Sequence, residues 1–168
     1  MEEVYCRIKG FDNYAVSNLG NVINIKKYGK LVKQSNSNGY YKSFLKKDGI
    51  RKQYFIHRIV ADTFIDKVDG KKLVDHINGD KMDNKISNLR WCNYTENSRN
   101  RKISSLNTSS VKGVSYVIKR NKWRAQIRIN IKLKHIGDYN TLEEATIARQ
   151  NKAMELFGDF LNECEKIK

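Results

Sequence analysis

The segment from 73 to 97, LVDHINGDKMDNKISNLRWCNYTEN, contains polar side chains whose types and spacing could do hydrolytic chemistry. Asp75 and His76 end an apolar stretch, Asn88 precedes a second one, and Asn97 lies in the polar stretch that follows. Folded as strand, loop, strand and helix, the segment brings Asp75 and Asn97 together, and both offer oxygen to a hard divalent cation. His76 can then remove a proton from water, because an unperturbed imidazole pKa of about 6.5 leaves it largely neutral at pH 7. One metal ion and one imidazole suffice to hydrolyse a phosphodiester.

This spacing, D-H, then N-L-R-W, then N, resembles the HNH (ββα-metal) nuclease motif, and is most similar to the HNH homing endonucleases of phages. The resemblance implies that Asp75 and Asn97 bind one Mg²⁺ or Mn²⁺ and that His76 is the general base. It also implies that Asn88 ties the loop to the rest of the motif by hydrogen bonds. Asn84 is the second candidate for that structural role. The third motif position is Asn97 rather than His, as in many phage members.

The cysteines at positions 6, 92 and 164 are odd in number and widely spaced, which argues against a disulfide scaffold and for a reducing compartment. The paired Cys-x-x-Cys motifs that bind zinc in some HNH proteins are absent from the sequence, so we expect no structural zinc. Trp91 and the apolar residues at 73, 74, 86 and 89 must hold the motif instead.

The charge balance favours a polyanionic partner. The chain has 168 residues, with 33 Lys and Arg against 18 Asp and Glu, and a formal net charge of +15. Nucleic acid is the first expectation, although an AT-rich genome alone would also enrich lysine. The absence of a long apolar run excludes a membrane-spanning helix, and the acidic, mixed start MEEVYCRIKG does not resemble a secretory signal. We therefore expect a cytoplasmic, nucleoid-associated protein.

Residues 1–56 predict a β-rich module. Strands are expected at 14–17, 21–25, 40–45 and 53–56, separated by turns that include Asn38-Gly39 and the hairpin signal Asp48-Gly49. The pattern G-F-x-x-Y-x-V-S-N-x-G-x-V from Gly10 to Val22 resembles the small module that often precedes HNH in phage homing endonucleases and contributes to DNA contact. The exposed lysines are the DNA candidates, namely Lys26, Lys27, Lys30, Lys33, Lys42, Lys46 and Lys47.

Residues 57–103 predict the nuclease core, with helices at 58–65 and 94–103 and strands at 72–76 and 89–92. His57 is expected to be a packed or capping residue, with a second catalytic base as the alternative. Three arginines near the motif are candidates for contacts with phosphate, namely Arg58, Arg90 and Arg99. The stretch 104–110 is rich in Ser, Asn and Thr and is predicted to be a linker.

Residues 111–160 predict strands at 114–118, 122–130 and 132–136, then a helix that runs to Phe157 and ends at Gly158. Thr141 and Glu144 form a capping box signature. Val111 to Lys134 contains 8 basic residues and no acidic one, which suits a basic sheet backed by a helix. Residues 161–168 are a tail.

This region resembles the plant ethylene-response-factor (APETALA-type) DNA-binding domain through K-G-V, K-W-R-A-Q-I-R, H-I-G-x-Y and T-x-E-E-A. The resemblance implies a three-stranded sheet in the major groove. Period-2 alternation independently places Trp123, Ala125, Ile127 and Ile129 on one face and leaves the other face to read bases. The base-reading candidates are Arg124, Gln126 and Arg128. The phosphate candidates are Lys119, Arg120, Lys122 and Lys134, and His135 is either a DNA contact or a sheet-edge residue.

Together these features predict an α+β protein: a β-rich module, a ββα-metal core, a linker, and a three-stranded antiparallel sheet packed on one helix. The predicted function is a site-specific homing endonuclease that nicks one strand of duplex DNA as a monomer on a long asymmetric site, leaving 5′-phosphate and 3′-hydroxyl ends. No small-molecule substrate is expected. The alternatives are a non-catalytic DNA-binding regulator with a relic HNH motif, an RNA-directed protein, and a non-specific nuclease toxin.

Overall fold

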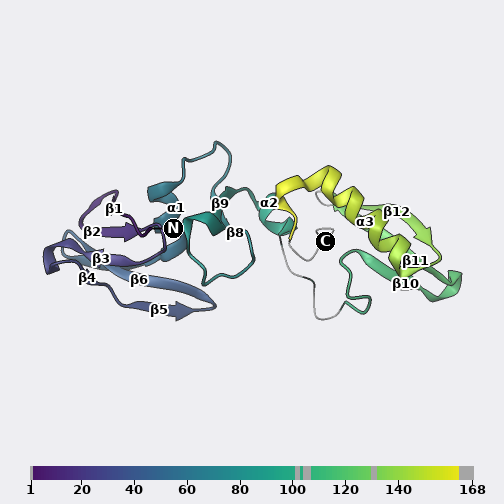
Figure 1. Ribbon diagram of the computed structural model, residues 1–168, viewed down its shortest axis with the longest axis horizontal. Coiled ribbons are helices and arrows are strands. Elements are labelled where there is room, and N and C mark those ends of the chain that lie inside the picture. Colours follow the sequence, from purple (N-terminus) through teal and green to yellow (C-terminus); the bar gives the residue numbers. More distant parts are fainter. Residues whose placement is uncertain (1, 101–102, 104–106, 130–131, 163–168) are drawn as a thin grey trace. The chain divides into compact units, whose positions relative to one another are not determined.

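A computed structural model describes residues 2–100, 103, 107–129 and 132–162. The chain folds into two compact units, Met1–Asn93 and Tyr94–Lys168 (Figure 1). The sequence-predicted boundary at 56/57 therefore lies inside the first unit. No helix in the described part of the chain is long and apolar enough to cross a membrane.

The first unit begins with two small antiparallel sheets. The first sheet is a meander of β1 (Tyr5–Ile8), β2 (Phe11–Ser17), β3 (Val22–Asn24) and β4 (Lys30–Leu31). The second contains β5 (Gln34–Ser37), β6 (Tyr40–Lys47) and β7 (Ile50–Phe55). Both of its connections are two-residue turns, Asn38-Gly39 and Asp48-Gly49, in which every φ is positive. This is the backbone that type I′ hairpins require, so the predicted hairpin at Asp48-Gly49 is confirmed.

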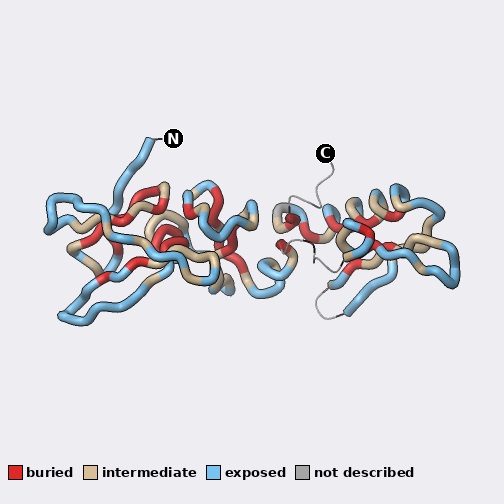
Figure 2. The backbone as a smooth tube through the Cα atoms, turned by 90° about the horizontal axis from the view of Figure 1, so that it is seen from below, coloured by how far each residue is buried: buried red, intermediate tan, exposed pale blue. Residues whose placement is uncertain are grey.

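Helix α1 (Ile56–Phe64) connects the sheets to the candidate motif, which folds as the antiparallel pair β8 (Leu73–His76) and β9 (Leu89–Cys92). A single core joins these parts: Val16 and Val22 from the first sheet pack in one cluster with Val60 from α1 and Leu89 from β9. The indole of Trp91 donates to the Ile65 carbonyl at 3.1 Å. Figure 2 shows this buried interior in red beneath exposed turns.

The second unit contains α2 (Tyr94–Arg99), the sheet β10 (Val114–Val117), β11 (Lys122–Ile129) and β12 (Lys132–Tyr139), and helix α3 (Leu142–Phe157). The predicted capping box is present: Thr141 Oγ1 accepts from the Glu144 amide, and the Glu144 carboxylate accepts from the Thr141 amide. Ala125 and Ile127 of β11 pack in clusters with Ala145, Ala153 and other α3 residues. The α+β class and the three-stranded antiparallel sheet on one helix are therefore confirmed.

Strand β12 is longer than predicted because it contains a bulge. Ala125 pairs with Gly137 whereas Gln126 pairs with His135, so Ile136 is an extra residue on β12. The bulge lets the strand continue to Tyr139 while Ile136 still packs against the core.

Parts of some predictions lie outside the described residues: the helix end at 101–102, the linker at 104–106, the strand end at Asn130, the tail from 163 and Cys164. Of the described cysteines, Cys6 is exposed and Cys92 is buried, and both are reduced.

Candidate active site

His76 ends strand β8, where pairing with Leu89 of β9 fixes its backbone. Its side chain is buried, and Nε2 lies 3.3 Å from Asn84 Oδ1. The Asn84 amide nitrogen donates to the Met82 carbonyl, which orients the amide oxygen towards the imidazole. Nε2 therefore carries the proton in the neutral ring, and Nδ1 carries the lone pair. This is the tautomer in which Nδ1 can act as a base.

The loop between β8 and β9 is held by Asn88, which is also buried. Its Oδ1 accepts from the Asn78 amide at 2.9 Å, and its Nδ2 donates to the Asp83 carbonyl at 2.8 Å. Asn88 thus ties the two ends of the loop together, while Asn84 contacts the imidazole itself. The two asparagines perform separate tasks, one for the loop and one for the ring.

A second imidazole packs against the first. The ring centroid of His57 lies 5.1 Å from that of His76, and the rings of Tyr40 and Phe55 lie 5.2 and 5.3 Å from His57. Within the described part of the chain, the buried Nδ1 of His57 has no hydrogen-bond partner. Lys81 Nζ stands 4.7 Å from the Tyr40 ring centre. His76 therefore lies beside the rings of His57 from α1 and Tyr40 from β6, and Phe55 of β7 packs against both of those rings.

This enclosure favours neutral imidazoles. Burial, aided by the charges of His76 and Arg58, lowers the pKa of His57 to about 3. Burial also lowers the pKa of His76, although its hydrogen bond to Asn84 and the nearby carboxylate of Asp75 oppose the shift. Both rings are thus uncharged near neutral pH, and a neutral ring is what a general base requires.

The first sheet supports the loop that contains Asn84. Gly20 has a φ of +91°, and a Cβ at that position would lie 2.9 Å from the Asn84 Cβ. The Ile86 amide donates to the Asn18 carbonyl at 2.8 Å. The turn between β2 and β3 therefore sets the position of the residue that orients His76.

Asp75 forms an ion pair with Arg90 across the β8 and β9 pair. Arg90 Nε and Nη2 donate to Asp75 Oδ2 at 2.9 and 2.7 Å, and the carboxylate is almost fully buried. Arg90 was predicted as a phosphate contact, and the structure places it instead beside the candidate metal ligand. Asn97 is exposed on α2, in the second unit, so its pairing with Asp75 stays a prediction.

The donor types suit a hard cation. A carboxylate and an amide oxygen are ligands that Mg²⁺ and Mn²⁺ accept, and such ions commonly complete their shell with water and phosphate oxygens. Among the described residues, no cluster of three or more His, Cys, Asp or Glu side chains could hold a metal ion. The assignment of Asp75 and Asn97 as metal ligands stays a prediction.

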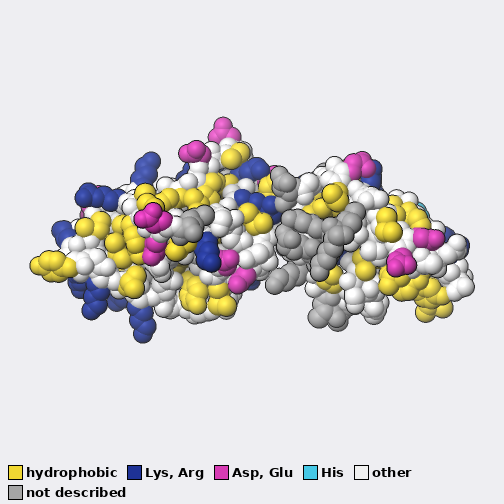
Figure 3. All heavy atoms as spheres, in the orientation of Figure 1, with side chains coloured by type: hydrophobic (Ala, Val, Ile, Leu, Met, Phe, Trp, Pro, Cys, Tyr) yellow, Lys and Arg dark blue, Asp and Glu magenta, His cyan; other side chains and the backbone are white. Residues whose placement is uncertain are grey.

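The predicted DNA-contacting cations of the first unit fall in different places. Lys26, Lys27 and Lys46 line one surface hollow of about 490 Å³. Lys42 instead lies with Nζ 4.5 Å from the Phe55 ring centre, and Arg58 donates to the Lys72 carbonyl at 3.0 Å. Figure 3 shows Lys and Arg side chains projecting around β3, β4 and β6.

On the sheet of the second unit, Asp138 holds two of the predicted DNA contacts. Arg124 donates to both carboxylate oxygens at 2.9 and 3.2 Å, and Arg120 donates to Oδ2 at 2.9 Å. The hydrogen bond from Arg124 and then that from Arg120 lower the pKa of Asp138 to about 2, and the same carboxylate raises the pKa of Arg124. His135 Nε2 lies 3.7 Å from Asp138 Oδ1. The arrangement fixes the guanidinium planes on this face.

The remaining predicted contacts of this unit do not join that group. Lys122 donates to Asn140, Gln126 is half-buried, and Arg128 is exposed. Lys119 and Lys134 are also exposed, and Arg99 packs on the ring of Phe157.

Sequence reasoning did not assign three residues that the structure places in these sites: Tyr40, Lys81 and Asp138. Tyr40 and Asp138 gain their positions from strand pairing, and Lys81 gains its position from the loop between β8 and β9. For Asp138 a signal existed, because it is the first acidic residue after a long basic stretch.

Two family models match this chain. Residues 54–99 match the HNH endonuclease model, and residues 3–46 match the NUMOD4 motif. Two uncharacterized HNH endonucleases of Acanthamoeba polyphaga mimivirus are 40% identical over 143 residues (83% of this chain) and 42% identical over 88 residues (52% of this chain). DNA endonuclease I-HmuI of Bacillus phage SP01 is 35% identical over 122 residues, or 66% of this chain.

The matched regions span 33%, 26% and 64% of the lengths of these three relatives. The solved structure of the HNH homing endonuclease I-HmuI, described for DNA binding and cleavage, superposes with a TM-score of 0.53 at 29% identity. That match covers 94% of this chain and 84% of the other.

Proposed function

We propose that this chain, which carries an HNH endonuclease domain at residues 54–99 and a NUMOD4 motif at residues 3–46, is a site-specific DNA endonuclease of the homing type. The observation that carries the proposal is the orientation of His76: a buried, neutral imidazole whose Nε2 faces Asn84 and whose Nδ1 holds the lone pair. The likeness to I-HmuI in sequence and fold supports DNA as the substrate. Its proposed place of action is the cytoplasm of a bacterial or phage-infected cell.

In the proposed reaction, His76 Nδ1 takes a proton from water, and the resulting hydroxide attacks the phosphorus. The bond from phosphorus to the 3′ oxygen breaks, and the products are a 5′-phosphate and a 3′-hydroxyl that takes its proton from solvent. Asn84 holds the ring in the required tautomer, and Arg90 neutralises the buried Asp75 carboxylate. Asp75 and Asn97 would hold one Mg²⁺ or Mn²⁺, which when bound stabilises negative charge on the phosphate and on the leaving oxygen.

The second unit is proposed to read the DNA sequence as an ethylene-response-factor-like domain. Its three-stranded antiparallel sheet backed by one helix and its outward-facing arginines support this assignment. Arg124, Gln126 and Arg128 would contact base edges, and Lys119, Arg120, Lys122 and Lys134 would contact phosphates. We also propose that the protein acts as a monomer and nicks one strand of a long asymmetric site.

The test is cleavage-end mapping on genomic DNA of the source and of intron-lacking relatives, in Mg²⁺, in Mn²⁺ and in EDTA. Metal-dependent ends at one locus that disappear in His76→Ala are the expected result, and their strand pattern separates a nick from a double cut. Scattered ends would indicate a non-specific nuclease. Footprints at discrete sites with no cleavage would favour the non-catalytic regulator.

A further inference from the structure

The hairpin of β3 and β4 in the first unit holds a tyrosine in a backbone conformation that tyrosine rarely adopts. Tyr28 follows the 3₁₀ turn Ile25–Lys27 and has φ 53° and ψ 39°, in the left-handed region. In that region Cβ comes close to a carbonyl oxygen, so Gly is favoured there and, among the other residues, Asn and Asp. A bulky side chain in this conformation lowers the stability of the fold, and such outliers point to a function.

The second unit contains the same turn with a residue that suits it. Ile118–Arg120 form a 3₁₀ turn, and Asn121 follows it with φ 51° and ψ 44°. Each turn consists of Ile and two cations. The Asn121 side chain also accepts a hydrogen bond from the Tyr116 hydroxyl within the chain. The turn itself therefore does not require a tyrosine in the left-handed position.

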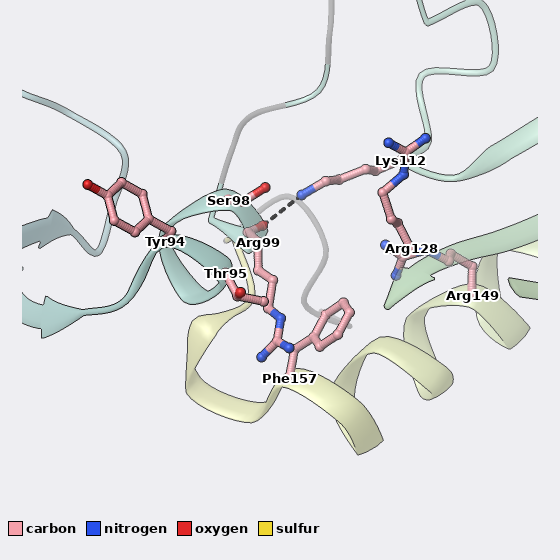
Figure 4. A pocket seen from close by; sticks show the side chains of 8 residues that line it. All are labelled: Tyr94, Thr95, Ser98, Arg99, Lys112, Arg128, Arg149 and Phe157. Carbon is pink, nitrogen blue, oxygen red and sulfur yellow. Dashed lines mark hydrogen bonds between the residues drawn. The ribbon is translucent and has the colours of Figure 1, made fainter. Parts of the chain in front are cut away.

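No contact within the described part of the chain compensates for this conformation. Tyr28 is fully exposed, at 103% of the reference area for tyrosine, and its ring neither hydrogen-bonds nor stacks with a described residue. Tyr94 is also largely exposed, but it begins helix α2, where its backbone is ordinary (Figure 4). Tyr28 thus combines an unfavourable backbone with a ring that only a partner outside the chain can cover.

The surroundings of Tyr28 are cationic and partly apolar. From Asn13 to Lys47 the sequence contains seven Lys and no Asp or Glu. Ile25 and Leu31 of the same hairpin are 37% and 63% exposed. Figure 3 shows hydrophobic atoms at the left end of the view, where this hairpin lies, with Lys and Arg side chains on either side. Duplex DNA has the complementary pattern, because each groove exposes bases and sugars between two rows of phosphates.

We propose that Tyr28 is an apolar wedge for duplex DNA: its ring enters a groove and packs against the bases, while the lysines beside it contact phosphates. Apolar side chains inserted in this way partly unstack a base step and kink the duplex, and the added contact offsets the cost of unstacking. The wedge accounts for a strained tyrosine where the second unit has asparagine. The choice of DNA rests on the proposed function, whereas the strained and uncovered ring rests on the structure alone.

The test measures DNA affinity and thermal stability of the full chain and of Tyr28→Asn. Anisotropy of a fluorescein-labelled duplex with TA steps, which deform easily, gives the affinity in EDTA. We expect the variant to bind about tenfold more weakly, as for the loss of a stacked aromatic ring. Its Tm should rise by about 2–4 °C, because asparagine relieves the left-handed conformation. Opposite changes of affinity and Tm exclude misfolding as the cause.

Three further variants serve as controls. Tyr28→Phe keeps both the ring and the strain, so its affinity and Tm should match those of the wild type. Lys27→Gln should lower the slope of log K against log salt by about 1, whereas Tyr28→Asn should leave that slope unchanged. Val68→Asn removes an apolar side chain that is 50% exposed in the same unit outside the hairpin, and should change affinity less than about twofold.

Two results would overturn the proposal: equal affinities of wild type and Tyr28→Asn, or a loss of affinity that a lower Tm accompanies. A third arm offers vesicles of phosphatidylserine and phosphatidylcholine, because an anionic membrane also attracts an apolar group among cations. If vesicle binding depends on Tyr28 while DNA affinity does not, the partner is a membrane surface and the DNA assignment falls.

This readout separates the wedge from the proposed catalysis. Affinity is measured without metal and without cleavage, so an inactive chain whose DNA binding depends on Tyr28 would remove the endonuclease proposal and keep this one. An active chain whose affinity does not depend on Tyr28 would do the opposite.

Discussion

The two units of this chain differ in the charge state and exposure of their ionisable side chains. In the first unit, His57 and His76 are buried against aromatic rings, and burial holds both imidazoles neutral. In the second, Arg120 and Arg124 stand around the Asp138 carboxylate, whose pKa they lower to about 2. The first unit shields two imidazoles from water, one of which is the proposed base, whereas the second holds permanent charges on a sheet face.

This difference separates the variables that control each unit. Proton exchange at a desolvated imidazole depends on pH and little on salt, because a buried group is poorly screened. Contacts between exposed cations and phosphate depend strongly on salt and, for arginine, scarcely on pH near neutrality. The rate of cleavage and the affinity for DNA should therefore respond to different substitutions and conditions.

The largest expected effect is the loss of the base. His76→Ala should lower the single-turnover cleavage rate by a factor of about 10² to 10⁴, the range for removal of a general acid or base, and leave DNA affinity unchanged. Arg124→Gln/Arg128→Gln should do the reverse, weakening affinity while the rate at saturating DNA stays the same. Quench-flow on a substrate with the mapped target, with anisotropy for binding, measures both. Normal cleavage by His76→Ala would exclude it as the base.

The next effect tests whether the first sheet positions the catalytic loop. Gly20→Ala should destabilise the fold by about 1–3 kcal/mol, because the residue has positive φ and its Cβ would meet Asn84. Cleavage should fall as well, since Asn84 orients His76. Gly29→Ala is the matched control: its φ is also positive, at +73°, but a Cβ there meets nothing within 4 Å. Equal losses of stability and cleavage in the two variants would show that strain alone, not contact with Asn84, is responsible.

Local patterns predicted much of the fold. Strand β9 occupies the predicted residues Leu89–Cys92, helix α3 ends at Phe157 as predicted, and the capping box at Thr141 is present. These elements carry their signal within a few residues, as alternation, caps or turn residues. By contrast, β5 is the polar sequence QSNS, which has no strand pattern, and it becomes a strand because the Asn38-Gly39 turn brings it beside β6.

The candidate site likewise contains residues that local sequence marks and residues that only tertiary contacts bring together. Asp75 and His76 are adjacent in sequence, so their spacing alone marks them. The contact between His76 and Asn84 and the packing of His57 and Tyr40 arise only when β6, α1 and the loop meet. The ion pair between Asp75 and Arg90 depends on the register of β8 against β9, which no local pattern fixes.

A smaller effect concerns the stability of the first unit against pH. The pKa of His57 is about 3 in the folded chain and about 6.5 when unfolded, so the unfolded chain binds more protons between these values. Stability is therefore present at pH 7 and is lost as the pH falls below about 6.5. From pH 7 to pH 5 we expect a loss of about 1–2 kcal/mol from this group. Denaturant unfolding should show it in the wild type and a flatter profile in His57→Phe; parallel profiles would refute the assignment.

The smallest expected effect tests whether Arg120 and Arg124 contribute to DNA binding through their fixed orientation or only through their positive charge. Asp138→Asn removes the carboxylate that holds Arg120 and Arg124 and raises the net charge by one. Non-specific DNA affinity at low salt should rise about threefold, whereas discrimination between the target and a scrambled duplex should fall, because released guanidinium groups no longer present a fixed donor pattern. Asp62→Asn, which frees exposed Lys67 in the first unit, adds the same charge without touching the sheet. Competition binding should leave its discrimination unchanged. Equal loss of discrimination in both variants would show that net charge, rather than the fixed orientation of Arg120 and Arg124, governs binding.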